Sequence, residues 1–212
     1  MPPRNICRNL LAALLLVVGI VSSGASSGAP PVLLVFGDSI SAGYGLPPGK
    51  GWVSLLAERV RAEGYAYTVV NGSVSGDTTA GGRARLPTYL KEYKPAIVVL
   101  ELGGNDALRG GKLSDTRANL EAMVTAAQSA RAKVLIIGMQ VPPNYGPAYA
   151  RDFAALFADV AKAKRVPLVP AFFAGFGDDL SLFQPDRIHP TVQAQQKLLD
   201  NVWPALHPML KR

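Results

Sequence analysis

Four short polar segments of the chain carry the side chains that acyl transfer by a serine nucleophile needs. They are residues 37–39 (GDS), Gly76, residues 103–106 (GGND) and residues 186–189 (DRIH). In such chemistry a hydroxyl attacks, a histidine takes its proton, an acid orients the histidine, and N–H donors stabilise the oxyanion. Each segment alone is weak evidence, but their order and placement together favour this reaction class.

Ser39 directly follows residues 32–36, an apolar run typical of a buried strand. A serine there can be exposed, held on rigid backbone and placed at a helix N-terminus. Helix capping or a plain turn also explains Gly-Asp-Ser, and for the tripeptide alone that reading is the stronger one. The Gly-x-Ser-x-Gly elbow is absent, because Ser41 stands where its second glycine belongs. An ordinary α/β-hydrolase elbow is therefore disfavoured.

His189 is one of two histidines, and the other, His207, lies next to a proline near the C-terminus and is expected at the surface. Asp186 precedes His189 by three residues, so a turn would bring its carboxylate to the imidazole. The carboxylate would then fix the tautomer and stabilise the imidazolium. The alternative is an ordinary turn before a helix that starts near Pro190.

Asn105 follows another apolar run, and its amide can donate to an oxyanion, as can the backbone N–H groups of Ser39 and Gly76. The alternative for Asn105 is a structural role in a glycine turn. Asp38, Asp77 and Asp106 lie next to these residues and could form a site for a hard metal ion. That alternative leaves Ser39 without a role, so we expect no metal. No zinc, Walker or dinucleotide-binding pattern is present, and no cofactor is expected.

Strand-like and helix-like segments alternate along the chain. Strands are expected at 32–36, 67–70, 96–102, 134–139 and 167–169, and helices at 52–63, 78–93, 116–130, around 153–160 and at 191–206. This alternation predicts an α/β fold, with a five-stranded parallel sheet covered on both faces. In a flavodoxin-like order of 2-1-3-4-5, the loops bearing Ser39, Gly76 and Asn105 converge at one edge of the sheet.

The motifs resemble those of the SGNH, or GDSL, hydrolase family. Residues 36–41 (FGDSIS), 71–78 (NGSVSGDT), 103–106 (GGND) and 186–190 (DRIHP) match its four sequence blocks. Residues 103–110 (GGNDALRG) and 141–146 (VPPNYG) are typical of its periplasmic thioesterase/protease/lysophospholipase subgroup, which includes arylesterases. The resemblance covers about residues 32–206 and implies a three-layer α/β/α sandwich.

The resemblance also implies a role for each matching residue. Ser39 would be the nucleophile, His189 the base and Asp186 its orienting acid. Ser39, Gly76 and Asn105 would form the oxyanion hole. The implied activity is hydrolysis of acyl esters, including aryl esters and lysophospholipids, with thioesters as a further candidate class. Carbohydrate O-deacetylation on the same scaffold is the alternative activity, and a catalytically silent binding module is a third.

The acyl group is expected along two apolar, irregular stretches, 141–145 and 170–186. A connection as long as the second is usually functional in a compact domain. Tyr145 and Phe173 are the candidate contacts, and Leu108 is expected on a mobile loop over the same site. The alternative is that the aromatic side chains only pack the second stretch against the domain.

The N-terminus reads as a secretory signal peptide over residues 1–29, followed by one hydrolase domain at 30–212. Arg4 and Arg8 precede a twelve-residue apolar stretch that is short for a membrane span. Cleavage is expected after Ala25 or Ala29, and an uncleaved anchor is the alternative. We expect a periplasmic or secreted protein without a membrane span after cleavage. The only cysteine, Cys7, precedes that stretch, so the mature protein has no disulfide.

The composition indicates a globular chain and gives little support to a nucleic-acid partner. Hydrophobic residues make up 49% of the 212 residues and charged residues 17%. The net charge of +7 comes from scattered basic residues without an aromatic-studded basic run, so nucleic acid is not an expected partner. The expected partner is a small acyl ester or lipid, and the oligomeric state is left open.

Overall fold

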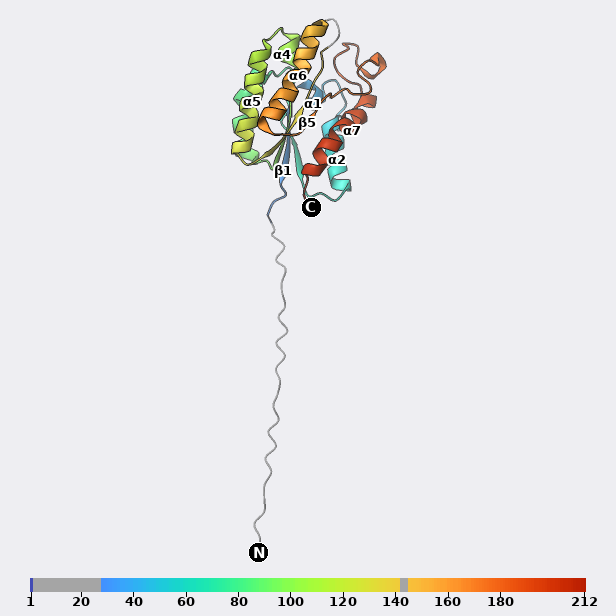
Figure 1. Ribbon diagram of the computed structural model, residues 1–212. Coiled ribbons are helices and arrows are strands. Elements are labelled where there is room, and N and C mark those ends of the chain that lie inside the picture. Colours follow the sequence, from blue (N-terminus) through green and yellow to red (C-terminus); the bar gives the residue numbers. More distant parts are fainter. Residues whose placement is uncertain (2–27, 142–144) are drawn as a thin grey trace.

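The computed structural model describes residue 1 and residues 28–141 and 145–212, which form an α/β domain around one parallel sheet (Figure 1). The strands are β1 (Val32–Gly37), β2 (Thr68–Asn71), β3 (Ile97–Glu101), β4 (Lys133–Ile137) and β5 (Leu168–Val169). Their order is β2-β1-β3-β4-β5, and each neighbouring pair is parallel. The predicted α/β class and the strand order 2-1-3-4-5 are confirmed.

The central strands are apolar because helices cover both of their faces. β1 reads VLLVFG and β3 reads IVVLE, and every residue of β3 is buried. In the register, Gly37 pairs with Glu101, so the ends of β1 and β3 reach the same edge of the sheet. The loops after β1 and β3 therefore start side by side.

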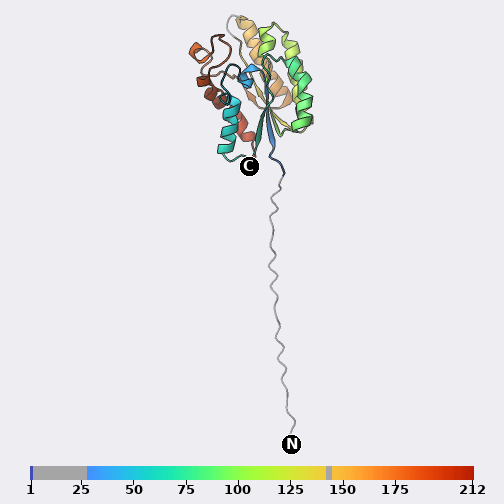
Figure 2. The same cartoon turned by 180° about the vertical axis from the view of Figure 1, so that it is seen from behind.

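The longer helices form the two outer layers of the sandwich. They are α2 (Trp52–Ala62), α3 (Thr79–Tyr93), α5 (Leu113–Ser129), α6 (Pro147–Lys164) and α7 (Gln195–Leu206). α3, α5 and α6 pack in sequence against one another, while α2 packs with α7. Figures 1 and 2 show these two groups on opposite faces of the sheet.

The helix faces follow the apolar periodicity of the sequence. In α6, Phe153, Leu156, Phe157 and Val160 are all buried, as their spacing predicts. Trp52, Leu56 and Val60 form the corresponding stripe of α2. In α3, Gly82 faces Leu102 so closely that a Cβ would overlap that side chain, which explains a glycine in the first turns of a regular helix.

Two short helices at the carboxyl edge of the sheet were not predicted. They are α1 (Ser39–Ala42) and α4 (Gly104–Leu108). Short 3₁₀ turns η2 (Leu180–Leu182), η3 (Val192–Ala194) and η4 (His207–Met209) also occur. The expected helix at 191–206 is therefore a 3₁₀ turn followed by α7, and the expected helix at 116–130 begins three residues earlier, at Leu113.

The signal-peptide prediction concerns residues that lie almost wholly outside the described part of the chain. The two described segments, 28–141 and 145–212, contain no helix with the length and apolar character needed to cross a membrane.

Candidate active site

Ser39 is the first residue of α1 and follows β1 after a single residue. That intervening residue, Asp38, caps the helix, because its Oδ1 accepts a 3.0 Å hydrogen bond from the Ile40 N–H. The cap is thus the Asp38 side chain, and the Ser39 hydroxyl is available for other contacts. α1 ends at Gly43, whose φ of 76° lies in the left-handed region that favours glycine.

The imidazole of His189 contacts the Ser39 hydroxyl directly. His189 Nε2 lies 2.7 Å from Ser39 Oγ, although 150 residues separate them in sequence. His189 Nδ1 lies 2.7 Å from Asp186 Oδ2. An ionised carboxylate only accepts hydrogen bonds, so Nδ1 carries the proton and Nε2 accepts from the serine. The three side chains form one hydrogen-bonded line within reach of proton transfer.

Asp186 is held in place by its own segment. Its Oδ1 accepts hydrogen bonds from the backbone N–H groups of Ile188, at 2.9 Å, and His189, at 3.0 Å. Partial burial acts to raise the pKa of Asp186, but these two hydrogen bonds and the imidazole outweigh it, so the pKa lies below its ordinary value. Asp186 is therefore ionised at neutral pH.

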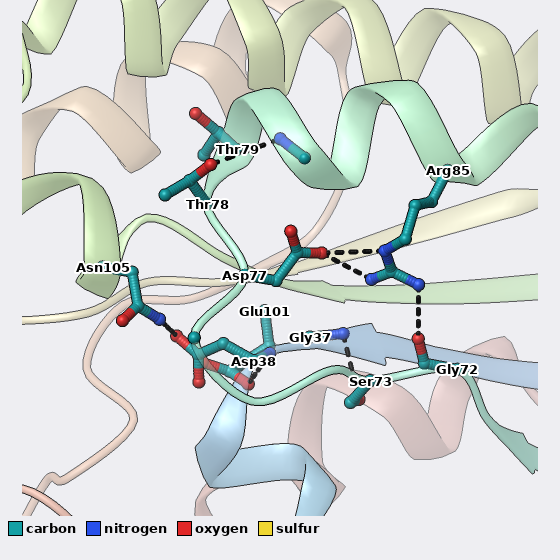
Figure 3. Close-up of polar contacts among 12 residues, drawn as sticks. Gly37, Asp38, Gly72, Ser73, Asp77, Thr78, Thr79, Arg85, Glu101 and Asn105 are labelled. Carbon is teal, nitrogen blue, oxygen red and sulfur yellow. Dashed lines mark hydrogen bonds and ion pairs between the residues drawn. The ribbon is translucent and has the colours of Figure 1, made fainter.

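Asn105 and Gly76 reach this region from the loops after β3 and β2. The Asn105 amide nitrogen donates a 3.1 Å hydrogen bond to Asp38 Oδ2, next to Ser39 (Figure 3). Gly76 has a φ of 78°, and its carbonyl accepts a 2.8 Å hydrogen bond from Arg109 Nη2. The Gly37 N–H donates to the Ser73 hydroxyl, which ties the β1 and β2 loops together. The predicted convergence of the three loops is present.

Arg85 fastens the loop that contains Gly76, a role that the sequence analysis did not anticipate. Its Nε and Nη2 donate to one oxygen of Asp77, and its Nη1 donates to the Gly72 carbonyl at 3.1 Å (Figure 3). The guanidinium also lies 4.4 Å from the centre of the Phe36 ring. Arg85 thus joins α3 to both ends of the loop between Gly72 and Asp77.

Glu101 is a second residue that the sequence analysis did not assign. It ends β3, is completely buried, and its Oε2 accepts a 2.6 Å hydrogen bond from Ser41 Oγ and a 3.3 Å bond from the Asp38 N–H. Trp52 Nε1 donates to Ser41 Oγ in turn. The only sequence signal was one acid in an otherwise apolar strand. A Cβ on Gly37 would overlap the Glu101 carboxyl, so a glycine is needed there.

The two buried acids beneath Ser39 have raised pKa values. Burial raises the pKa of Glu101 well above its usual range, and the Asp38 carboxylate acts in the same direction. Burial also raises the pKa of Asp38 from 3.8 to about 6, against the hydrogen bond from Ile40. Glu101 Oε1 has no hydrogen-bond partner in the described part of the chain. A neutral Glu101 is consistent with its complete burial.

The three aspartates of the metal alternative are each directed to other partners. Asp38 accepts from Asn105, Asp77 pairs with Arg85, and Asp106 accepts from both the N–H and the hydroxyl of Thr79. No group of three or more His, Cys, Asp or Glu side chains in residues 28–141 and 145–212 is arranged to hold a metal ion.

The predicted acyl-chain contacts lie in different surroundings. Leu108, the last residue of α4, is exposed. Tyr145 stacks on Tyr149, with the ring centres 5.9 Å apart, and the rest of the motif at 142–144 lies outside the described residues. Phe173 is half-buried in an aromatic cluster with Phe172, Phe176 and Phe183. This cluster packs the long 170–186 connection against the domain, and the acyl-binding roles stay predictions.

Comparison with known proteins identifies the family. Residues 35–197 match the GDSL-like lipase/acylhydrolase family. The chain belongs to this family. It is 49% identical over 201 residues to a protein named esterase TesA from Pseudomonas aeruginosa, an alignment that covers 95% of this chain and 98% of the relative. The chain is a GDSL hydrolase, and more specifically a serine esterase that hydrolyses carboxylic esters.

Two further relatives support the assignment to the GDSL hydrolases. The Escherichia coli K12 protein named thioesterase 1/protease 1/lysophospholipase L1 is 37% identical over 184 residues, which is 87% of each chain. A solved structure titled as that of TesA has a TM-score of 0.83 and 52% identity, and it covers 84% of this chain and 99% of the other.

Proposed function

We propose that this esterase forms an acyl-enzyme on Ser39, with His189 as the general base and Asp186 as its orienting acid. The observation that carries the proposal is the continuous line of contacts from Asp186 through His189 to Ser39, with both distances at 2.7 Å. The oxyanion is stabilised by the N–H groups of Ser39 and Gly76 and by the Asn105 amide. Two contacts support these roles: the Asn105 amide hydrogen-bonds Asp38, the residue before Ser39, and the Ser73 hydroxyl of the loop that contains Gly76 accepts from the Gly37 N–H.

Acylation begins when Ser39 Oγ attacks the carbonyl carbon of the ester and its proton moves to His189 Nε2. The carbonyl oxygen becomes an oxyanion that accepts hydrogen bonds from the three donors. The C–O bond to the leaving group then breaks, and the alcohol takes the proton from His189. Asp186, ionised because of its backbone hydrogen bonds, stabilises the imidazolium between these two steps.

Deacylation repeats the sequence with water. His189 removes a proton from a water molecule, which attacks the acyl carbon and forms a second oxyanion. Collapse of this intermediate returns the proton to Ser39 Oγ and releases a carboxylic acid. No step requires a metal ion or a cofactor.

The proposed substrates are aryl esters, from which an aryl alcohol leaves, and lysophospholipids, from which the glycerophosphate head group leaves. Acyl thioesters are a further class. The relatives are named as an esterase, an arylesterase and a thioesterase/lysophospholipase, and these names support this range. A panel of an aryl ester, an acyl thioester and an acetylated sugar separates these activities from carbohydrate deacetylation. Dominant turnover of the acetylated sugar would overturn the substrate proposal.

Labelling with a fluorophosphonate tests the nucleophile. Mass spectrometry should place the label on Ser39, and Ser39→Ala should lose labelling and about 10⁴-fold in kcat while keeping its fold. Ser114→Ala, which changes an exposed serine, is the matched control. A folded Ser39→Ala protein with a tenth of the wild-type turnover would exclude Ser39 as the nucleophile.

We also propose that residues 1–29 direct the protein to the periplasm or the medium and are then removed. The basic start, the apolar stretch and the small residues before Ala25 and Ala29 support this proposal. Intact-mass analysis of protein from the expressing cells should give a mature chain that begins at residue 26 or 30. A chain that retains Arg4 and Arg8 in the membrane fraction would indicate an uncleaved anchor instead.

A further inference from the structure

The segment that carries Asp186 and His189 is a small hairpin closed by its own backbone. Phe183 and Pro190 form an antiparallel bridge, the Gln184 N–H donates to the His189 carbonyl at 2.7 Å, and the Thr191 N–H donates to the Leu182 carbonyl at 2.8 Å. The hairpin fixes Asp186 relative to His189. It does not by itself fix the distance from His189 to Ser39, which belongs to another part of the chain.

The side-chain amide of Gln184 joins this hairpin to the segment that bears Ser39. Gln184 Nε2 donates to the Tyr44 carbonyl at 2.8 Å and to the Pro190 carbonyl at 3.3 Å. Tyr44 follows Gly43, the C-cap of α1, and its N–H donates to the Ser39 carbonyl. Pro190 directly follows His189. One amide group therefore links the residue after the base to the turn that closes the nucleophile's helix.

The surroundings of Gln184 are shaped around its amide. A Cβ on Gly45 would overlap Gln184 Oε1, so the chain approaches this side chain as closely as only glycine permits. Gly45 has a φ of 73°, which glycine also favours. The Tyr44 ring lies 4.6 Å from the His189 imidazole, so the same contact places an aromatic wall beside the base.

A second amide, that of Gln195, holds the other side of the hairpin. Gln195 is buried, its Oε1 accepts from the Trp52 N–H at 2.9 Å, and its Nε2 donates to the carbonyls of Pro190 and Thr191. The Pro190 carbonyl thus accepts hydrogen bonds from the side-chain amides of both glutamines. Because Gln184 is only half-buried, it can be replaced with less risk to folding than Gln195.

We propose that Gln184 is a positioning residue that docks the Asp186–His189 hairpin onto the Ser39 segment. The inference rests on the proposed roles of Ser39 and His189. Proton transfer from the serine depends steeply on the Nε2–Oγ distance, and a displacement of about 1 Å can cost about 10²-fold in rate. Gln184 controls this distance without contacting the reacting atoms.

The first test replaces Gln184 with glutamate, which keeps the shape but cannot donate to the two carbonyls. We expect kcat, and the rate of phosphonylation by a fluorophosphonate, to fall by about 10²-fold with little change in KM. The low-field proton resonance of His189 Nδ1–H should remain, because the Asp186 contact lies within the hairpin. Gln196→Glu is the matched control, since the exposed Gln196 amide donates a hydrogen bond to Asp200 and lies outside the hairpin, and it should behave as wild type.

The second test displaces the amide without changing Gln184. Gly45→Ala introduces a Cβ that overlaps Gln184 Oε1, whereas Gly49→Ala places an alanine at a similar φ of 79° in open space. We expect Gly45→Ala to lower kcat in the same way as Gln184→Glu, and Gly49→Ala to keep wild-type kcat. The double variant Gln184→Glu/Gly45→Ala should be little worse than either single variant, because both break one contact.

Three outcomes would overturn the inference. They are a Gln184→Glu kcat within about twofold of wild type, equal losses in the Gly45 and Gly49 variants, and loss of the Nδ1–H resonance in a folded Gln184→Glu protein, which would indicate a general structural role. If Gln184→Glu does not fold, the comparison of kcat between Gly45→Ala and Gly49→Ala tests the inference. Phosphonylation of the wild type separates this result from the proposed function, since an unlabelled Ser39 refutes the mechanism itself.

Discussion

The side-chain amide of Asn105 donates a 3.1 Å hydrogen bond to the carboxylate of Asp38, the residue immediately before Ser39. An amide nitrogen has two N–H groups, and this contact uses one of them. The other N–H group is the one that we propose donates to an oxyanion formed at Ser39. Asp38 therefore both caps the helix that begins with Ser39 and orients the amide donor of the neighbouring loop.

Asn105→Ala should lower kcat by about 10²–10³-fold, the usual loss for one oxyanion donor. KM should change much less, because the bond strengthens in the transition state. Asp38→Asn should also lower kcat, since it places an amide opposite the amide of Asn105. Steady-state kinetics on an aryl ester measures both variants. A large rise in KM with unaltered kcat would assign Asn105 to ground-state binding.

Asp186→Asn should preserve the fold but lower kcat/KM by less than the roughly 10⁴-fold cost known for this change in another serine hydrolase. A backbone carbonyl in so short a turn can partly replace the carboxylate. His189→Ala should be more damaging, and the double variant should be little worse than His189→Ala alone, because the pair acts as one unit. Losses that multiply in the double variant would show that the two residues work independently.

Glu101→Gln should remove a pH dependence of stability. The pKa of Glu101 is raised in the folded protein, so above its ordinary pKa of 4.5 the native state holds a proton that the unfolded chain releases. Stability should therefore fall as pH rises from 4.5 toward the raised pKa, by up to about 1.4 kcal/mol per pH unit. Urea unfolding of wild type and Glu101→Gln between pH 5 and 8 (about these limits) measures the difference.

The control for Glu101 is Glu58→Gln, which changes an exposed glutamate of α2 and should follow the wild-type curve. Asp38, whose pKa is raised to about 6, also lowers stability as the pH rises, and it does so in both proteins. Because the Asp38 carboxylate helps to raise the pKa of Glu101, the two carboxyl groups influence each other, and the difference between wild type and Glu101→Gln measures Glu101 together with this coupling. Parallel curves for these two proteins would mean that Glu101 is ionised in the native state.

Tyr145→Ala or Phe173→Ala should change the ratio of long-chain to short-chain ester hydrolysis. The two rings lie on the two apolar connections expected to carry the acyl group, and removal of a ring shortens the apolar contact. Tyr93→Ala, at the far end of α3, is the control. The measurement is kcat/KM for a series of aryl esters of increasing acyl length. An unchanged ratio in both variants would contradict this placement, as would an equal change in the control.

The sequence was sufficient for the sheet because its signals are local. Apolar runs that are buried on both faces mark β1 and β3, and alternation with helical stripes implies the parallel order. The expected ends of the strands differ from the observed ones by one or two residues. The helices α1 and α4 were missed because four or five residues leave no periodicity, and their ends depend on glycines such as Gly43 and Gly103.

Contacts between side chains distant in sequence could not be predicted. The line from Asp186 to His189 follows from a spacing of three, but the amide of Gln184 acts across 140 residues on a backbone carbonyl, which any residue supplies. Arg85 and Glu101 likewise have partners that no local pattern indicates. The one visible anomaly was an acidic residue, Glu101, inside an apolar strand. Its role depends on its hydrogen bond with Ser41, which Trp52 also contacts.

The sequence separation of 150 positions between Ser39 and His189 has a consequence for the timing of activity. During synthesis Ser39 leaves the ribosome long before the hairpin that carries His189. The two side chains come into contact only after the strands between them have formed the sheet. A partly synthesised chain that contains Ser39 but not yet His189 lacks the base that we propose. With the proposed roles of Ser39 and His189, the esterase activity is therefore absent until the complete chain has folded.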